Sequence, residues 1–218
     1  MSIVIVGAGP NLGRAIARRF GRERLAVGFI SRSTDKLRGL TEEVRAEGLT
    51  ASCAVADIRD AAALQSAIRE LADALGPGEV LEYSPLPAKE FMKPILETSV
   101  DDVRGSLEFS VLGAVAAATA VIDGMLERGS GTILYTTGGA AIHPNPLRAG
   151  VGISFAGEVA YARMLHDEVR DKGIHVAHTA IGGSIAPGGD HEPEDIAEIL
   201  WQQHVERTAF QTLVGIES

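Results

Sequence analysis

The sequence predicts a doubly wound α/β fold, in which helices cover both faces of a parallel sheet of about seven strands. Short β-branched apolar runs alternate with longer amphipathic stretches along the whole chain. These runs are apolar on both faces, as the buried strands of parallel sheets are. No linker, repeat or break in composition divides the 218 residues. Residues 1–218 are therefore predicted to form a single domain.

Each predicted element follows from its pattern and its ends. The apolar runs predict strands at 3–6, 25–30, 51–55, 79–82, 132–135, 174–179 and 211–214. The amphipathic stretches predict helices at 12–21, 35–47, 61–75, 103–128, 154–172 and 193–207. Gly48 and Gly173 follow the second and fifth helices, where a left-handed residue commonly ends a helix. Pro193 opens the last helix, at a position that needs no backbone N–H donor.

Charge and composition exclude several classes of partner. The chain carries 20 Lys+Arg against 29 Asp+Glu, a net charge of −9. Such a field repels a phosphate backbone, so we expect neither nucleic acid nor a membrane surface as a partner. The longest uncharged apolar run, 111–122, is too short for a spanning helix, and no basic segment precedes the first strand. Cys53, the single cysteine, is expected in the core, and the composition fits a reducing cytoplasm.

A glycine-rich turn at residues 7–13 connects the first strand to the first helix. Glycines permit a tight turn and close backbone approach, and a pyrophosphate can then bind at the positive end of the helix. A tight surface loop is the alternative for so short a pattern. The place of this glycine-rich turn, between a strand and a helix, favours a dinucleotide site in a Rossmann-type fold. The residues expected to bind the dinucleotide here are Gly7, Gly9, Asn11, Leu12 and Gly13.

A basic residue follows the second strand, where Rossmann-type proteins distinguish NAD from NADP. An acidic residue there binds the ribose 2′-OH of NAD, whereas a guanidinium accommodates the 2′-phosphate of NADP. The segment Ser31-Arg32-Ser33 offers a guanidinium between two hydroxyls. It predicts NADP(H) in preference to NAD(H). A solvated arginine with no ligand is the alternative.

These segments resemble the short-chain dehydrogenase/reductase family over nearly the whole chain. Gly7 and Gly13 match glycines of the family's Gly-x-x-x-Gly-x-Gly turn, with Asn11 at its middle glycine. Residues 173–176, Gly-Ile-His-Val, resemble the family's Gly-Ile-Arg-Val. The resemblance implies an NAD(P)-dependent oxidoreductase acting on a small molecule. It also implies a homodimer or homotetramer built from the helices at 103–128 and 154–172.

The resemblance extends to the third strand end but departs at the next one. Asp57, with Ile58, matches the family's acidic residue that hydrogen-bonds adenine. Alternatively, Asp57 belongs only to the N-terminal cap region of the next helix. After the fourth strand, Tyr83-Ser84-Pro85-Leu86 stands where the family has Asn-Asn-Ala-Gly. The adenine pocket is therefore expected to have a rebuilt wall.

The family's catalytic positions carry different residues in this chain. The asparagine and serine positions fall on Ser110 and Gly138, and the Tyr-x-x-x-Lys pair falls on Val151 and Phe155. No Tyr-x-x-x-Lys occurs anywhere in the sequence. In the family pair, the lysine ammonium lowers the pKa of the phenol that donates a proton to the substrate. Valine cannot donate a proton, and phenylalanine has no charge that could lower the pKa of a neighbouring group.

Three residues are candidates for the missing proton donor. Thr137, next to Thr136, ends the fifth strand, although both hydroxyls could simply close that strand. His143 follows the same strand end and is either an acid near neutrality or a surface-loop residue. Tyr83 could reach the cleft from the fourth strand end. We expect no metal site, since His175 and His178 fall on opposite faces of a strand.

Two functions remain open from the sequence. The first is an NADP(H)-binding oxidoreductase with an atypical active site and an unknown substrate. The second is a non-catalytic dinucleotide-binding sensor or interaction protein, which the joint loss of four catalytic positions favours. Only about ten residues, 183–192, separate the sixth strand from the last helix, so we expect an open substrate site.

Overall fold

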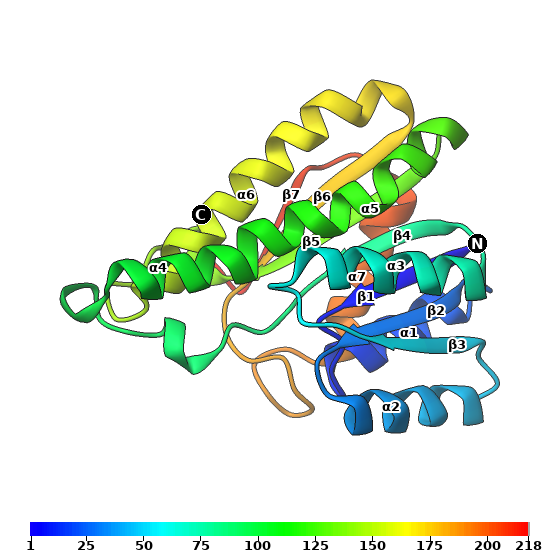
Figure 1. Ribbon diagram of the computed structural model, residues 1–218, viewed down its shortest axis with the longest axis horizontal. Coiled ribbons are helices and arrows are strands. Elements are labelled where there is room, and N and C mark those ends of the chain that lie inside the picture. Colours follow the sequence, from blue (N-terminus) through cyan, green and yellow to red (C-terminus); the bar gives the residue numbers. More distant parts are fainter. Residues whose placement is uncertain (218) are drawn as a thin grey trace.

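Seven parallel strands form one sheet in the order β3-β2-β1-β4-β5-β6-β7 (Figure 1). This is seen in the computed structural model, which describes residues 1–217. The strands are β1 (Ser2–Val6), β2 (Ala26–Ser31), β3 (Ala51–Val55), β4 (Gly78–Tyr83), β5 (Gly131–Gly138), β6 (Ile174–Ile181) and β7 (Gln211–Val214). The strand order confirms the predicted doubly wound sheet. Its direction of winding reverses between β1 and β4, and ligands bind at such a switch point in open α/β sheets.

Helices cover both faces of the sheet, as predicted. They are α1 (Leu12–Gly21), α2 (Thr34–Ala46), α3 (Ala61–Leu75), α4 (Val100–Leu107), α5 (Gly113–Arg128), α6 (Ala149–Val169) and α7 (Pro193–Glu206). α3, α5 and α6 pack on one face (Figure 1), and α1, α2 and α7 pack on the other. Short 3₁₀ turns occupy Lys89–Phe91, Ile95–Glu97, Gly139–Ala141 and Arg170–Lys172.

The apolar residues of the strands divide into two cores. On β1, Val4 and Val6 belong to the core under α3, α5 and α6, whereas Ile3 and Ile5 belong to the core under α1 and α7. The same alternation holds on the other central strands, because successive side chains point to opposite faces. The parity of a residue along its strand therefore decides which helices it meets.

Helix α6 begins at Ala149, five residues before the predicted start. Gly150 and Gly152 weaken the helical signal, since glycine is a poor helix former. In the fold, a Cβ atom at Gly150 would lie 2.9 Å from the Phe91 carbonyl oxygen. Gly150 is thus needed for close packing against the segment after β4. This tertiary contact explains why the helix continues through a glycine-rich stretch.

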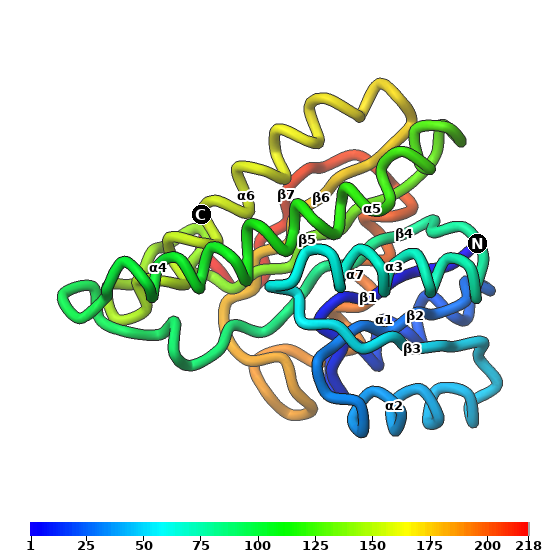
Figure 2. Tube along the Cα trace, in the orientation of Figure 1, coloured from blue at the N-terminus to red at the C-terminus, as the bar shows by residue number. Residues whose placement is uncertain are grey.

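The helix predicted at 103–128 begins earlier and is interrupted. It starts at Val100, after a capping box in which the Ser99 Oγ accepts from the Asp102 N–H at 3.1 Å and the Asp102 carboxylate accepts from the Ser99 N–H at 2.9 Å. A π-helical turn, Glu108–Leu112, separates α4 from α5. The trace nevertheless runs on in one direction through this turn (Figure 2). Such turns often mark functional positions.

One helical segment has the length and apolar composition of a membrane-spanning helix. Within residues 1–217, the helical segment Val100–Arg128, which includes the π-helical turn, is the one long and apolar enough to cross a bilayer by length and composition. In this fold it packs against α3 and α6. Its apolar composition is therefore accounted for in part by the core.

Candidate functional site

The glycine-rich turn after β1 meets the loop after β4. Gly7 has a φ of +88°, a conformation that favours glycine. A Cβ atom at Gly7 would lie only 2.4 Å from the Cα of Pro85. The N–H groups of Gly7 and Ala8 donate to the Ile30 carbonyl at 2.9 and 3.1 Å, which holds the turn against the end of β2. Both the backbone angle and this close approach require glycine at position 7.

The rest of the turn surrounds an open space at the start of α1. No atom lies within 4 Å of the position that a Cβ of Gly9 would take. Gly13 packs closely on Ala8, whose Cα would be 3.2 Å from a Cβ at position 13. The Arg14 N–H donates to the Gly9 carbonyl at 3.2 Å, and the first i→i−4 bond of α1 runs from the Ala15 N–H to the Asn11 carbonyl at 3.1 Å. The first N–H groups of a helix have no partner within the helix, so an anion is favoured at the start of α1.

Asn11, which replaces the family's middle glycine, connects the turn to the loop after β6. Its Nδ2 donates to the Ile185 carbonyl at 3.3 Å. That loop, residues 182–192, is itself braced by Asp190, whose carboxylate accepts from the Ser184 N–H at 2.7 Å and from its hydroxyl at 2.8 Å. The loop is as short as predicted, but it is anchored to the glycine turn.

A cleft of about 540 Å³ opens at the carboxyl ends of the central strands. Five segments line it: the glycine turn, the loop after β4, the end of β5, the start of α6 and the loop after β6. The cleft thus joins the open space of the glycine turn to the positions of the family's catalytic residues. The predicted site residues in its lining are Gly7, Gly9, Asn11, Leu12, Gly13 and Thr137.

Three polar residues predicted to select the dinucleotide lie at the end of β2. Arg32 is exposed, and Ser31 and Ser33 are half-buried. Ser33 precedes α2, but its side chain makes no capping hydrogen bond to that helix. These residues lie outside the lining of the 540 Å³ cleft, one strand away from the glycine turn. Their side chains are accessible to a ligand that extends beyond the cleft along this edge.

Asp57 and Ile58 follow β3 at the same edge. The Arg59 guanidinium donates to both oxygens of Asp57, with the closer contact at 2.8 Å. This hydrogen bonding, with a smaller contribution from the charge of Arg32, holds the pKa of Asp57 below its ordinary value. Ile58 is buried. Asp57 is therefore an ionised acceptor that already has a basic partner.

Two of the three predicted proton donors, Tyr83 and His143, do not line the cleft. Tyr83 is fully buried, and its hydroxyl donates to the Phe109 carbonyl at 2.6 Å. Its ring lies in the core that packs under α5, and Tyr83 is absent from the cleft lining formed by the described residues, so this geometry does not support its predicted role. His143 is exposed, and its Nε2 lies 2.9 Å from the Glu217 carbonyl oxygen. It is absent from the cleft lining formed by the described residues, so its predicted role is not supported by this geometry.

Thr137 does line the cleft, and a buried hydrogen-bond chain sets the direction of its hydroxyl. The Gln211 Nε2 donates to the His178 Nδ1 at 3.2 Å. Burial lowers the pKa of His178 to about 4, so the ring is neutral near pH 7 and carries its proton on Nε2. That N–H then donates to the Thr137 Oγ1 at 2.7 Å. Thr137 is left with its own hydroxyl proton to donate into the cleft.

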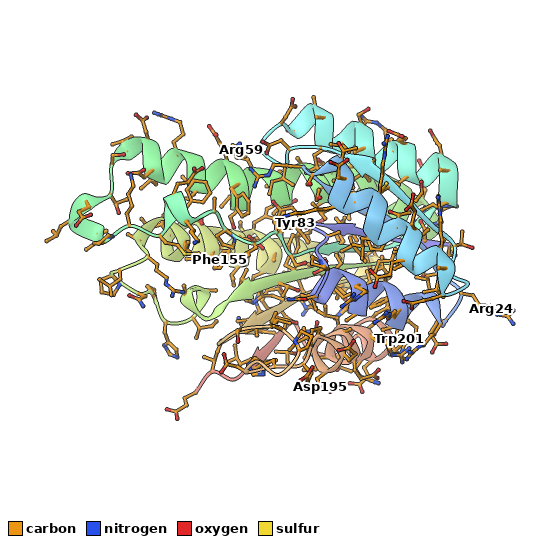
Figure 3. The ribbon with its side chains drawn as sticks, turned by 90° about the horizontal axis from the view of Figure 1, so that it is seen from below. Arg24, Arg59, Tyr83, Phe155, Asp195 and Trp201 are labelled. Carbon is orange, nitrogen blue, oxygen red and sulfur yellow. The ribbon has the colours of Figure 1, made fainter. Side chains whose placement is uncertain are left out.

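The positions of the family's catalytic residues gather around an apolar wall. Val151 and Phe155 both line the cleft from α6, and Figure 3 labels Phe155 on this helix. A Cβ atom at Gly138 would lie 3.5 Å from the Phe155 ring, so the aromatic ring faces the position of the missing serine. Ser110, in the π-helical turn, is buried and donates to the Glu158 carboxyl group.

Two lining residues were not predicted from the sequence. Met92 contributes apolar surface from the segment after β4, beside Leu86 of the expected wall, and Arg148 contributes a guanidinium from the residue before α6. No acidic side chain of the described residues lies within 4.0 Å of the Arg148 side-chain nitrogens. Such residues carry no motif, because only the path of the loops brings them to the cleft.

The histidines of β6 have separate surroundings. His178 bonds to Thr137 and Gln211, whereas the ring of His175 lies 6.0 Å, between centroids, from that of His166. Over residues 1–217, no three or more His, Cys, Asp or Glu side chains are grouped to hold a metal ion.

The chain is similar in sequence to known dehydrogenases and reductases. Residues 1–191 match the family model of short chain dehydrogenases. The very-long-chain 3-oxoacyl-CoA reductase of Anas platyrhynchos is 28% identical over 179 residues, covering 79% of this chain and 56% of that protein. The 2,3-dihydro-2,3-dihydroxybenzoate dehydrogenase of Bacillus subtilis (strain 168) is 27% identical over 213 residues, covering 97% and 76%. The chain thus spans little more than half the length of the first relative.

Solved structures have the same fold. A short-chain dehydrogenase from Rhodopseudomonas palustris superposes with a TM-score of 0.87 at 25% identity, covering 99% of this chain and 98% of that one. L-sorbose reductase from Gluconobacter frateurii, complexed with NADPH and L-sorbose, superposes with a TM-score of 0.89 at 19% identity, covering 99% and 94%. The fold similarity therefore extends over essentially the whole chain.

Proposed function

The chain belongs to the short-chain dehydrogenase family, and from this premise we propose that it binds NADP(H) and transfers hydride to or from a small substrate. The observation that carries the proposal is the open space at Gly9, between the glycine backbone and the start of α1. This space and the N–H groups beside it fit a pyrophosphate. The residues present therefore fit the cofactor that the family implies.

The preference for NADP(H) rests on the end of β2. Arg32 supplies a guanidinium there, which suits the 2′-phosphate of NADP. No acidic residue occupies positions 31–33, where it would bind the ribose of NAD. The superposable L-sorbose reductase was solved with NADPH, which agrees with this preference.

The walls of the cleft indicate the kind of substrate. Val151 and Phe155 offer an apolar surface, and Thr137 offers one oriented hydroxyl donor. When bound, the reduced dinucleotide supplies a hydride, and the protein positions the acceptor. We propose an apolar carbonyl compound or activated alkene as that acceptor, with its oxygen receiving a hydrogen bond from Thr137. Alkene reduction depends least on the absent tyrosine.

A substrate panel tests the catalytic proposal. The purified protein is mixed with NADPH and with ketones, quinones and enones, and the absorbance of the reduced cofactor is followed. We expect loss of this absorbance that depends on at least one substrate class. No substrate-dependent loss across the panel would reject hydride transfer.

Calorimetry with Arg32→Ala tests the cofactor preference separately. We expect Arg32→Ala to weaken NADPH binding by at least about tenfold, or ~1.4 kcal/mol, and to leave NADH binding unchanged. Arg69→Ala is the control, because Arg69 is also exposed but lies on α3. Equal losses for NADPH and NADH would contradict a 2′-phosphate contact.

A non-catalytic dinucleotide-binding sensor or interaction protein is the second candidate function. The apolar wall at Val151 and Phe155 favours it, because neither side chain can exchange a proton. This alternative predicts NADPH affinity that falls in Arg32→Ala, together with no turnover of any substrate. The substrate panel thus separates the two functions, whereas both predict the same result in calorimetry.

A further inference from the structure

A carboxyl group lies beneath the cleft with no access to solvent. Glu82, on β4, is 0% exposed. It is paired in register with Ile5 on β1 and Leu134 on β5, two core residues. A carboxyl group rarely takes such a position, because an isolated buried carboxylate is strongly destabilised. Neither the proposed hydride transfer nor the hydrogen bond from Thr137 involves Glu82.

Both oxygens of Glu82 are connected to hydroxyl groups of the cleft wall. Ser84 lies 2.9 Å from Oε2, and Thr136 lies 3.2 Å from Oε1, measured from their side-chain oxygens. Ser84 is half-buried and Thr136 is 9% exposed, and both residues line the cleft. A protonated Glu82 can donate to either hydroxyl, which then donates its own proton outward. The carboxyl group is thus one hydroxyl away from a molecule in the cleft.

The other groups at the cleft do not provide a general acid. Val151 and Phe155 carry no exchangeable proton, and the hydroxyl of Thr137 is a weak acid when unassisted. His178 is held neutral by burial and donates its one N–H to Thr137. Glu82 is therefore the carboxyl group that the geometry connects to the cleft.

We propose that Glu82 is the proton source of this active site and that the hydroxyls of Ser84 and Thr136 relay its proton to the substrate. The inference rests on the proposed function. A carbonyl whose carbon gains a hydride leaves an electron pair on its oxygen, which must take up one proton. A relay hydroxyl gives its proton to that oxygen and receives the proton of Glu82. Glu82 is left as a carboxylate, which solvent reprotonates after the product leaves.

The protonation of Glu82 suits this role. Burial raises its pKa to about 8, although the hydrogen bonds from Ser84 and Thr136 act in the opposite direction. The ionisable group that interacts with Glu82 is Glu158 on α6, whose pKa is raised chiefly by burial and further by the charge of Glu82. The side chains paired beside it on β1 and β5 are apolar. Glu82 therefore holds its proton at neutral pH and releases it near the working range.

Kinetics of Glu82→Gln test the proposal with a substrate found in the panel. Glutamine keeps the size of the side chain and its contacts with both hydroxyls, but it has no acidic proton. We expect kcat to fall by about 100-fold or more, with the dissociation constant of NADPH unchanged in calorimetry. The double variant Ser84→Ala/Thr136→Val should cause a similar loss. Glu206→Gln, exposed at the end of α7, is the matched control.

A second readout follows the proton itself. In a Glu158→Gln background, the infrared C=O band of a protonated buried carboxylic acid should titrate near pH 8 and be absent after Glu82→Gln. In active wild-type protein, kcat should fall as pH rises through the same value. An active wild-type protein with an unchanged kcat in Glu82→Gln would overturn this inference alone. A wild-type protein without turnover would overturn both the inference and the catalytic function.

Discussion

At the scale of single residues, two buried glutamates have strongly raised pKa values. Glu82 lies under the cleft, and Glu158 lies on α6 beside Ser110. Burial raises the pKa of each to about 8. Oε1 of Glu158 has no hydrogen-bond partner among the described residues. Both carboxyl groups are therefore protonated in the folded chain at neutral pH, whereas they ionise once the chain unfolds.

Glu158→Gln should reduce the dependence of stability on pH. Between the ordinary glutamate pKa and about 8, the folded chain retains a proton at Glu158 that the unfolded chain releases. The free energy of unfolding should therefore fall as pH rises through this window, by about 1.4 kcal/mol per pH unit for each such group. Glutamine removes the contribution of Glu158 and leaves that of Glu82. Urea denaturation at pH 5, 6, 7 and 8 should give a shallower slope than wild type.

The control for this slope is Glu127→Gln on the exposed side of α5. It removes an acidic group of the same kind without removing a buried one, so it should keep the wild-type slope. A Glu158→Gln slope equal to that of wild type would contradict a buried, protonated Glu158.

At the scale of elements, the turn between β1 and α1 assigns different tasks to its glycines. Gly7 adopts a left-handed angle and faces Pro85, so its task is structural. Gly9 faces open space, so nothing within the protein requires a glycine there. Asn11 carries the link to Ile185. The sequence motif therefore combines one position needed for folding with another that leaves room for a ligand.

Alanine substitutions should separate these tasks. Gly7→Ala should lower the free energy of unfolding by about 2–4 kcal/mol, from the strained angle and the clash with Pro85. Gly9→Ala should change stability by less than about 0.5 kcal/mol. It should nevertheless weaken NADPH binding, because the new methyl group enters the space at the start of α1. Urea denaturation and calorimetry measure the two effects. A Gly9→Ala protein that binds NADPH as wild type does would place the cofactor elsewhere.

At the scale of the whole molecule, α4, the π-helical turn before α5, and α6 present apolar side chains outward. Val100, Leu112 and Met164 are 75%, 55% and 65% exposed. A groove of about 590 Å³ runs along the outer side of α4 and the π-helical turn, from Thr98 to Leu112. Apolar patches of this kind commonly mark protein interfaces. We propose that these helices join copies of the chain in a homodimer or homotetramer.

Light scattering after size exclusion tests this assembly. Wild type should have at least twice the 22.9 kDa chain mass. Leu112→Arg should shift it to 22.9 kDa, because a charge in an apolar interface is not compensated there. Val205→Arg, at a 55% exposed position on α7, is the comparison and should keep the wild-type mass. Dissociation by Val205→Arg alone would place the interface on α7, and a monomeric wild type would reject the assembly.

Local patterns were enough to predict much of the fold. The seven strands are found within a few residues of their predicted limits, because the alternation of apolar runs and amphipathic stretches is a short-range property. The start of α6 was missed, because it depends on the contact of Gly150 with Phe91. The interruption of the long helix at Glu108–Leu112 was missed as well. The start of α6 arises from packing between segments far apart in the sequence, and within the π-helical turn the Phe109 carbonyl accepts from the Tyr83 hydroxyl of β4.

The sequence by itself determined the sheet, the glycine turn and the absence of a Tyr-x-x-x-Lys pair, since spacing along the chain defines each of them. Only the tertiary structure decided which side chains meet the cleft. Thr137 faces it, Tyr83 is turned under α5, and Glu82 lies beneath it within reach of two hydroxyls. The physical reason is that a strand residue meets its neighbours through sheet register and face. Both are set when the strands pair and the helices pack.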